Sequence, residues 1–174
     1  MEAFKRVVVI GNSGAGKSTF ARRLGAVTGL PVTHIDQLFW EPGWRQAPPD
    51  VYLDRLTRVV ESDRWIIEGV NTGTLDLRFP RTDKVFWLER SRVACLWRVG
   101  RRIAASYGRV RPDMAPGCPE QLPDFGFLSF IWTYPARIAP RIQAAVERHG
   151  LEGRTIRLRS DREAQAYLDK ITIG

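Results

Sequence analysis

The feature that most constrains the fold is the glycine-rich stretch GNSGAGKS at residues 11–18, which directly follows the β-branched run VVVI at residues 7–10. A short run of this kind suits a strand that is buried on both faces. After the stretch, apolar residues recur at helical spacing, at Phe20, Leu24 and Val27. The sequence therefore predicts a strand, a glycine-rich turn and a helix in that order, and similar alternation further along the chain predicts an α/β fold with a mainly parallel sheet.

The stretch matches the pattern G-x-x-x-x-G-K-[ST], and the chemistry of phosphate binding needs each fixed residue. Glycines let backbone N–H groups approach phosphate oxygens, the Lys17 ammonium reaches the β- and γ-phosphates, and the Ser18 hydroxyl binds Mg²⁺. The following helix directs the positive end of its dipole at the same anion. A merely flexible turn is the alternative, and average glycine content makes such a chance match rare. The candidate nucleotide-binding residues are Gly11, Ser13, Gly14, Ala15, Gly16, Lys17, Ser18 and Thr19.

Two further strand patterns, at residues 65–67 and 31–35, are each followed directly by an acidic residue, Glu68 and Asp36 respectively. Open α/β sheets bind ligands at the carboxyl ends of their strands. Glu68 is the candidate for a second protein contact to Mg²⁺, with a solvated strand-end residue as the alternative. Asp36 is the candidate that accepts the proton of an acceptor hydroxyl or binds the acceptor, with a turn or helix cap as the alternative. His34, two residues earlier, is more typical of a core histidine than of a ligand.

Seven arginines and no acidic residue occur between residues 90 and 111. Four prolines at residues 109–124 predict a long loop there, and two helical stretches follow with a break at Pro135. We expect residues 98–124 to act as a lid whose arginines neutralise a transferring phosphoryl group and exclude water. A solvated face with ion pairs is the alternative. The catalytic candidates are Lys17, Asp36, Arg101, Arg102, Arg109 and Arg111, with Arg98 next after them.

The chain has 174 residues and a formal net charge of +8, and all but four of its basic residues are arginine. This excess favours anionic partners but does not separate a nucleotide from a polynucleotide. No apolar run approaches the roughly 20 residues of a membrane helix and no secretory segment is recognisable, so we expect a cytoplasmic protein. Cys95 and Cys118 lack the spacing of a zinc site and are expected to be free thiols. Without repeats or linkers, residues 1–174 predict a single domain, and the sequence does not predict its oligomeric state.

Several motifs spread over nearly the whole chain together resemble a known family. Besides the glycine-rich stretch they are HID at residues 34–36, FW at 39–40, PGW at 42–44, WIIEG at 65–69, LWR at 96–98, RPDM at 111–114 and GCPE at 117–120. With these motifs the sequence resembles the small P-loop kinases known as DNA topology modulation proteins or adenylate kinase-like proteins. The phosphate-binding stretch is shared by a very large superfamily, whereas the last, cysteine-containing motif is much more specific to this group.

The resemblance implies a three-layer P-loop NTPase fold of the nucleoside monophosphate kinase type, with a five-stranded parallel sheet of order 2-3-1-4-5 and a helical or loop lid. It also implies ATP or GTP with Mg²⁺ at the phosphate loop and an acceptor site over the second strand. Glu68 matches the acid that follows the third strand of adenylate-like kinases, and Arg159 occupies the place where related kinases contact the base. The family commonly continues acid-Gly-Asn-Tyr, whereas here Val70 and Asn71 follow the glycine, which affects the expected acceptor contacts.

Together these features predict an ATP-dependent phosphotransferase that moves the γ-phosphoryl group to a small-molecule acceptor, with a nucleoside monophosphate as the first acceptor considered. Trp40 and Trp44 are candidates for stacking a base in the acceptor pocket, with core packing as the alternative. The alternative function is that of a nucleotide-gated nucleic-acid-binding protein, which the name of the DNA topology modulation proteins and the basic charge of the chain both allow. The sequence contains no helix-turn-helix, zinc-finger or RNA-stacking pattern.

Overall fold

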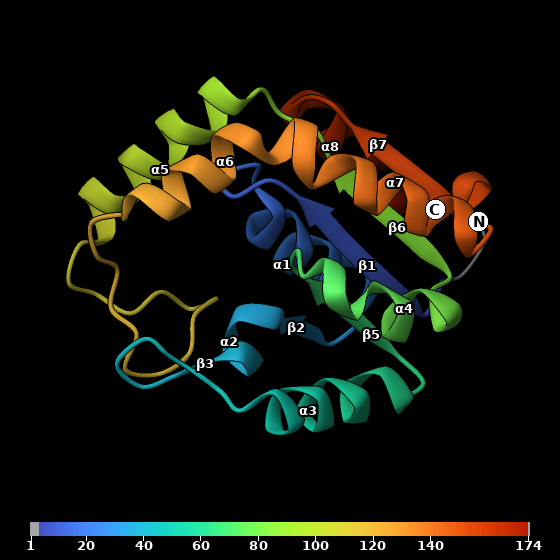
Figure 1. The fold of residues 1–174 in the computed structure, drawn as a ribbon. Coiled ribbons are helices and arrows are strands. Elements are labelled where there is room, and N and C mark those ends of the chain that lie inside the picture. Colours follow the sequence, from blue (N-terminus) through green and yellow to red (C-terminus); the bar gives the residue numbers. More distant parts are fainter. Residues whose placement is uncertain (1–3, 174) are drawn as a thin grey trace.

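The computed structural model describes residues 4–173 and is built around a five-stranded sheet (Figure 1). Its strands, in spatial order, are β2 (Val32–His34), β5 (Trp65–Glu68), β1 (Arg6–Gly11), β6 (Lys84–Leu88) and β7 (Thr155–Leu158). Counted along the chain within this sheet, the order is 2-3-1-4-5, which confirms the predicted α/β fold. Every pairing is parallel, so the carboxyl ends of all these strands meet at one edge. The outermost residues of the predicted domain, 1–3 and 174, lie outside the described residues.

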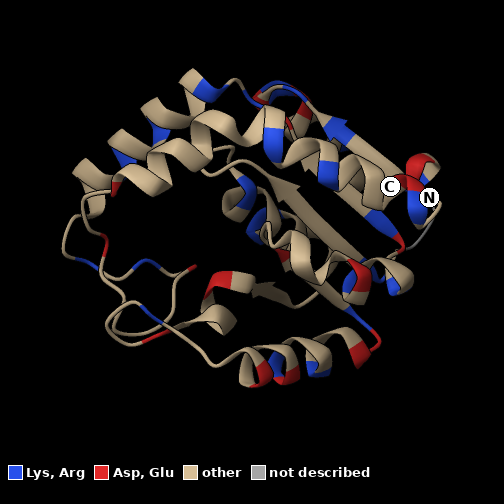
Figure 2. Ribbon diagram, in the orientation of Figure 1, with Lys and Arg blue, Asp and Glu red and all other residues tan. Residues whose placement is uncertain are grey.

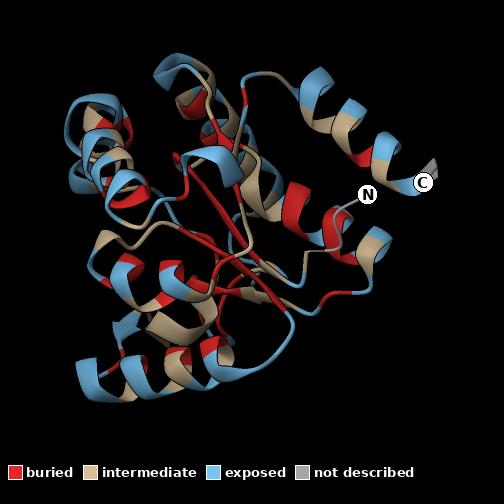
Figure 3. Ribbon diagram, turned by 90° about the vertical axis from the view of Figure 1, so that its right-hand side faces the viewer, coloured by how far each residue is buried: buried red, intermediate tan, exposed pale blue. Residues whose placement is uncertain are grey.

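Helices cover both faces of the sheet, because successive strand residues point to opposite sides. The helices are α1 (Lys17–Thr28), α2 (Ile35–Phe39), α3 (Pro49–Glu61), α4 (Leu75–Arg78), α5 (Arg92–Ser106), α6 (Phe125–Arg137), α7 (Ala139–Arg148) and α8 (Asp161–Ile173), with short 3₁₀ helices η1 (Thr72–Thr74), η2 (Phe79–Arg81) and η3 (Glu152–Arg154). Val7 and Val9 of β1 pack in one core cluster with α1, α5 and α8, whereas Val8 and Ile10 pack in another with α3, α4 and α7. Figure 3 shows the sheet as the most completely buried layer, with exposed residues on the outer faces of the helices.

Residues 107–124 form a long loop, here called the proline loop, which contains no helix or strand, as its prolines predict. The loop lies against a small hairpin of β3 (Trp40–Glu41) and β4 (Arg45–Gln46). The backbone N–H of Gly43 donates to the carbonyl of Gly117 at 2.8 Å, and Nε1 of Trp44 donates to the carbonyl of Pro119 at 2.9 Å. We call this contact the loop–hairpin joint. An apolar cluster completes it, made of Met114, Ala115, Cys118, Trp40 and Trp44.

The predicted helix break at Pro135 is wrong. Helix α6 continues through Pro135 to Arg137. The helical segment is interrupted only at Ile138, and the next helix, α7, carries Pro140 in its first turn. Because Pro135 has no N–H, the carbonyl of Ile131, four residues earlier, loses its helical donor. That carbonyl instead accepts a hydrogen bond of 2.9 Å from the side-chain Nδ2 of Asn12, in the glycine-rich turn. A side chain from a distant segment therefore satisfies the carbonyl and allows the helix to continue.

The surface carries most of the charge, and Figure 2 shows basic positions along the length of α5. Both cysteines are free, as predicted, and both are buried, with Cys95 on α5 and Cys118 in the proline loop. Within residues 4–173, none of the helices combines the length and the apolar character needed to cross a bilayer.

Candidate functional site

The glycine-rich turn at residues 11–18, here called the P-loop, joins the carboxyl end of β1 to α1. Gly11, Gly14 and Gly16 have φ angles of 147°, 82° and 93°, which residues with a side chain rarely adopt. A Cβ added to Gly11 would lie 2.4 Å from the carbonyl oxygen of Leu88, and one added to Gly14 would lie 2.4 Å from that of Cys95. Close approach of the main chain therefore requires glycine at positions 11 and 14 as much as the dihedral angles do, whereas at Gly16 only the dihedral angle requires it.

Asn12 fixes the P-loop from within and is only 2% exposed. Its Oδ1 accepts a hydrogen bond of 2.8 Å from the backbone N–H of Ser13, and its backbone carbonyl accepts one of 3.2 Å from Nζ of Lys17. Its Nδ2 is the donor to the carbonyl of Ile131 in α6. Sequence reasoning gave Asn12 no role, because the phosphate-binding pattern allows any residue at this position.

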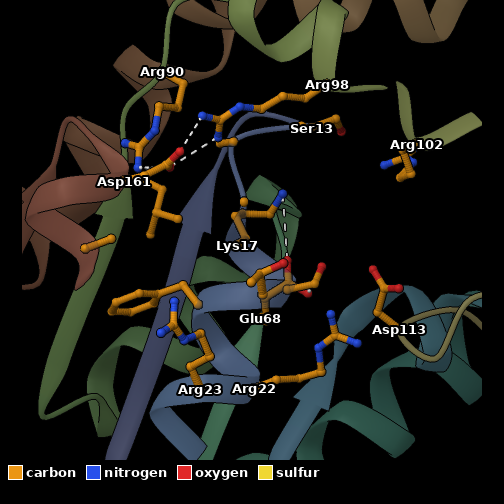
Figure 4. A pocket seen from close by; sticks show the side chains of 18 of the residues that line it. Ser13, Lys17, Arg22, Arg23, Glu68, Arg90, Arg98, Arg102, Asp113 and Asp161 are labelled. Carbon is orange, nitrogen blue, oxygen red and sulfur yellow. Dashed lines mark hydrogen bonds and ion pairs between the residues drawn. The ribbon is translucent and has the colours of Figure 1, made fainter. Parts of the chain in front are cut away.

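The Glu68 carboxylate lies at the carboxyl end of β5 and faces the P-loop (Figure 4). Its Oε2 accepts hydrogen bonds from Nδ1 of His34 at 2.7 Å and from Oγ of Ser18 at 3.2 Å, and its Oε1 lies 3.7 Å from Nζ of Lys17. Burial alone would raise the pKa of Glu68, but the hydrogen bond from His34 and the charge of Lys17 outweigh burial and lower it. The carboxylate is therefore held ionised between a hydroxyl and an ammonium group of the P-loop.

Two aspartates lie near Glu68. Asp36, in the first turn of α2, is open to the cavities but closely surrounded by protein atoms, and this desolvation, followed by the charge of Glu68, raises its pKa. Burial alone would raise the pKa of Asp113 as well, but the charge of Arg111 and the nearby Ser18 hydroxyl outweigh burial and lower it. Of the two carboxyl groups, Asp36 is thus the better proton acceptor.

Two cavities open beside the P-loop. Cavity one has a volume of about 700 Å³ and extends from the P-loop toward α8. At its far end Arg90 and Arg98 both pair with Asp161, at 3.0 and 2.7 Å, and Arg22 and Arg23 of α1 line it as well (Figure 4). Arginines therefore dominate its wall. The predicted nucleotide-binding residues that line it are Ser13, Gly14, Ala15, Gly16, Lys17, Ser18 and Thr19.

Cavity two has a volume of about 550 Å³ and is bounded by α2, the segment after β5, α6 and the proline loop. Trp40 and Trp44 both line it, together with Gly11 at the start of the P-loop. Trp44 has a φ of 60°, a left-handed conformation that is uncommon for a bulky residue, and its bond to Pro119 holds it there. The two cavities meet at a set of shared lining residues, here called the junction: Ser13, Lys17, Asp36, Glu68, Arg102 and Arg111.

The structure brings two of the four predicted lid arginines to the junction. Nη2 of Arg102 lies 2.9 Å from Oε1 of Glu120, and Nε of Arg111 lies 2.6 Å from Oε2 of the same carboxylate. Arg101 and Arg109 are exposed and line neither cavity. A catalytic role for these two arginines stays a prediction.

Arg159, predicted to contact the base, is exposed and lines neither cavity. Its Nε lies 3.4 Å from Oε2 of Glu89. The residues that approach this end of cavity one are Arg90 and Asp161, to which sequence reasoning gave no role. Asp161 starts α8 and Arg90 follows β6, so only the paired ends of β6 and β7 bring them together.

Arg78 is fully buried, and sequence reasoning also missed it. Its guanidinium donates to the carbonyls of Gly69 at 3.2 Å, Asn71 at 2.9 Å and Thr74 at 3.3 Å. Burial lowers the pKa of Arg78 to about 10. The side chain of Asn71 donates to the hydroxyl of Tyr52 at 3.2 Å. Val70 and Asn71, where the sequence departs from the pattern of the family it resembles, both line cavity two.

Oxygen donors suited to a divalent cation lie at the P-loop. The Ser18 hydroxyl donates a hydrogen bond to the ionised Glu68 carboxylate, and the ionised Asp113 carboxylate lies near the same hydroxyl. Mg²⁺ in kinases takes one or two carboxylates together with substrate phosphates and water, so this donor set fits Mg²⁺. In the described part of the chain, no group of three or more His, Cys, Asp or Glu side chains is arranged to hold a metal ion.

No family model and no curated protein matches the sequence, but solved structures match the fold. Shikimate kinase from Acinetobacter baumannii, in complex with shikimate, is 16% identical and superposes with a TM-score of 0.58 over 98% of this chain and 92% of that one. A gluconokinase from Sinorhizobium meliloti 1021 is 17% identical, with a TM-score of 0.53 over 97% and 94% of the chains. A sugar kinase from Janibacter sp. HTCC2649 is 16% identical, with a TM-score of 0.51 over 97% and 90%. The chain thus shares the fold of P-loop kinases.

Proposed function

We propose that this protein is an ATP-dependent phosphotransferase that acts on a small molecule. The observation that carries the proposal is the junction, where a cavity beside the P-loop meets a second cavity. Transfer between two bound molecules requires their reacting atoms to be held close together and aligned, which two cavities with a shared wall can provide. The fold shared with small-molecule kinases supports this reaction class by analogy.

Cavity one is assigned to the nucleotide, ATP or GTP. Backbone N–H groups of the P-loop and the Lys17 ammonium bind its phosphates, and the paired Arg90 and Arg98 border the remainder of the molecule. Ser18 and Glu68 would hold Mg²⁺, which neutralises negative charge on the phosphate oxygens. This assignment uses the P-loop residues that line cavity one and does not require Arg159.

Cavity two is assigned to the acceptor. The acceptor hydroxyl oxygen forms a bond to the γ-phosphorus while the bond to the β–γ bridging oxygen breaks, and ADP leaves with that electron pair. Asp36 accepts the hydroxyl proton, a role that its raised pKa favours. Arg102 and Arg111, which Glu120 holds in place, offer their remaining N–H groups to the transferring phosphoryl oxygens.

The size of cavity two admits acceptors as large as a nucleoside or a nucleoside monophosphate. Its volume of about 550 Å³ lies within the usual range for ligand pockets, roughly 300–1,000 Å³. A nucleoside monophosphate, the acceptor first considered from the sequence, would place its phosphate in this cavity, so the charge of the cavity wall decides between phosphorylated and unphosphorylated acceptors.

The proposal is tested by ADP release from ATP·Mg²⁺ in the presence of pooled metabolites, with separate pools of alcohols, carboxylates and phosphate esters. We expect one pool to stimulate turnover, and the Lys17→Ala variant to abolish that stimulation. Lys170→Ala, which removes an exposed lysine on α8, is the matched control and should keep full activity. Equal turnover in Lys17→Ala and the wild type, or no stimulation by any pool, would refute the proposal.

Nucleic-acid binding is a second candidate function, and one surface favours it. On the exposed face of α5 and α6, Arg92 lies over the ring of Trp132 at 4.1 Å and Arg101 over that of Trp97 at 4.7 Å. Arginine and aromatic side chains of this kind bind nucleic-acid backbones and bases. Titration with duplex and single-stranded DNA at about 50 to 300 mM salt tests it, because non-specific attraction is lost steeply with salt. Sub-micromolar binding retained at high salt would support this second function.

A further inference from the structure

The two cavities differ in charge once the six residues of the junction are set aside. Cavity one has four arginines of its own, Arg22, Arg23, Arg90 and Arg98, against the two aspartates Asp113 and Asp161. The residues that only cavity two contains include Glu120 and Asp124 but neither lysine nor arginine. The basic side chains that bind anions are therefore concentrated on the nucleotide side.

The two arginines at the junction are already paired with acids. Glu120, only 5% exposed, lies 2.9 Å from Arg102 and 2.6 Å from Arg111, and Arg111 also lies 2.8 Å from Asp113. A buried carboxylate that loses its cation is strongly destabilised, so an incoming anion does not readily take the place of Glu120. An acceptor phosphate in cavity two would meet Asp36, Glu120 and Asp124. The cations that reach this cavity, Lys17, Arg102 and Arg111, each lie within 4 Å of a carboxylate, and the proposed reaction already uses them for the phosphate groups of the nucleotide.

The rest of the wall of cavity two suits a flat apolar body. Phe39, Trp40 and Trp44 line one side, and Phe127 and Phe130 of α6 line another. Aromatic rings bury large apolar areas and stack on planar groups. Trp40 and Trp44 already touch each other at 5.4 Å between ring centroids and are held by the loop–hairpin joint, so this part of the wall is in place before the acceptor binds.

From the charge and the wall together, we infer that the acceptor is a ring-bearing alcohol without an anionic group, of the nucleoside type rather than the nucleotide type. The inference rests on the proposed phosphotransferase function and specifies its substrate class. It excludes nucleoside monophosphates, sugar phosphates and carboxylic acids as preferred acceptors. The planar ring packs between the aromatic side chains, and the hydroxyl group reaches Asp36 at the junction.

The test compares matched pairs of compounds that differ only in a phosphate group, namely nucleosides with their 5′-monophosphates and cyclic alcohols with their phosphate esters, at saturating ATP·Mg²⁺. We expect kcat/KM for the alcohols to exceed that for the esters by about 100-fold or more, because uncompensated like charges at a binding site cost several kcal/mol. Esters that react as well as or better than the alcohols would overturn the inference. If only carboxylates or phosphate esters are turned over, and Lys17→Ala loses that turnover, the inferred acceptor class is wrong while the phosphotransferase function stands. If no compound is turned over, both the acceptor class and the phosphotransferase function are refuted.

Two variants test the cause of the discrimination. Glu120→Gln removes the carboxylate that pairs with both Arg102 and Arg111, of which only Arg111 keeps a second acid, Asp113. Asp124→Asn removes an acid from the wall while keeping a residue that caps α6. Both should lower the ratio of alcohol to ester turnover by about tenfold, the effect of 1.4 kcal/mol. The matched control is Asp76→Asn, which removes an exposed acid paired with Arg148 and should leave the ratio unchanged. An unchanged ratio in both test variants, or an equal shift in the control, would contradict the inference.

Discussion

The hydrogen bond between Asn12 and the carbonyl of Ile131 leads to a quantitative prediction about how the P-loop is held. The carbonyl is free only because Pro135 lacks an N–H, and Asn12 supplies the missing donor at 2.9 Å. Replacing Asn12 by alanine removes that donor, and replacing Pro135 by alanine restores a helical one. The two substitutions should therefore be energetically coupled, although their positions are 123 residues apart in the chain.

The expected size of the coupling follows from the groups that lose partners. In Asn12→Ala, the buried carbonyl of Ile131 loses its donor, which costs about 1–3 kcal/mol, and the N–H of Ser13 loses an acceptor, which costs about 1 kcal/mol more. The free energy of unfolding should therefore fall by about 2–4 kcal/mol. In a Pro135→Ala background, the new N–H satisfies the carbonyl, and only the second cost of about 1 kcal/mol remains.

Urea unfolding of the wild type, both single variants and the double variant measures this coupling as a double-mutant cycle. We expect a coupling free energy of about 1–3 kcal/mol, with Asn12→Ala much less harmful when Pro135 is absent. Pro135→Ala alone is expected to be neutral or stabilising, because proline is the least favourable residue in a helix interior. Costs that add to within about 0.5 kcal/mol would refute the reasoning, since independent sites behave in that way.

Three further predictions concern carboxyl groups and a buried arginine. Asp36→Asn should lower kcat by about 10²- to 10⁴-fold. The same variant should unfold at higher urea concentration at pH 7, because the folded-state pKa of Asp36 is raised above 3.8 and ionisation there opposes folding; lower stability would indicate a structural role instead. The folded-state pKa of Glu68 is lowered below 4.5. Its contribution to stability is therefore present above pH 4.5 and is lost as the pH falls through the folded-state pKa. In unfolding curves measured over a series of pH values, the stability difference between the wild type and Glu68→Gln should shrink over that acid range. Arg78→Met should lower the free energy of unfolding by about 2–5 kcal/mol by leaving three carbonyls without a donor. It should also raise KM for the acceptor more than for ATP, whereas the exposed control Arg58→Met should change stability by no more than about 0.5 kcal/mol.

The sheet and the P-loop were predictable because their signals are local. The β-branched run at residues 7–10, the glycine spacing and the acids at strand ends are each contained in a few neighbouring residues. Parallel pairing then brings the strand ends to one edge, so the placement of Glu68 opposite Ser18 follows from the order of the elements. Such patterns predict structure well because the residues that determine each helix, strand or turn are neighbours in the sequence.

The partners of the arginines were not predictable in the same way. Asp161 and Glu120 reach Arg98 and Arg102 from segments 63 and 18 residues away, and the proline loop that carries Glu120 has no periodicity to orient it. Arg78 looks like any other arginine in the sequence, and only the fold shows that it is fully buried against backbone carbonyls. The failed prediction at Pro135 has the same origin, because a distant donor compensates the missing local bond.

The loop–hairpin joint has a consequence for the rate at which cavity two exchanges its contents. The proline loop and the hairpin belong to segments about 75 residues apart in the chain, yet main-chain and side-chain hydrogen bonds and a shared apolar cluster hold them together. Segments joined in this way open in a single cooperative event rather than by independent fluctuations. Amide protons on both sides of the joint, at Gly43 and in the loop, should then exchange with solvent at a common rate, and that rate sets an upper limit on how often a molecule can leave through this wall.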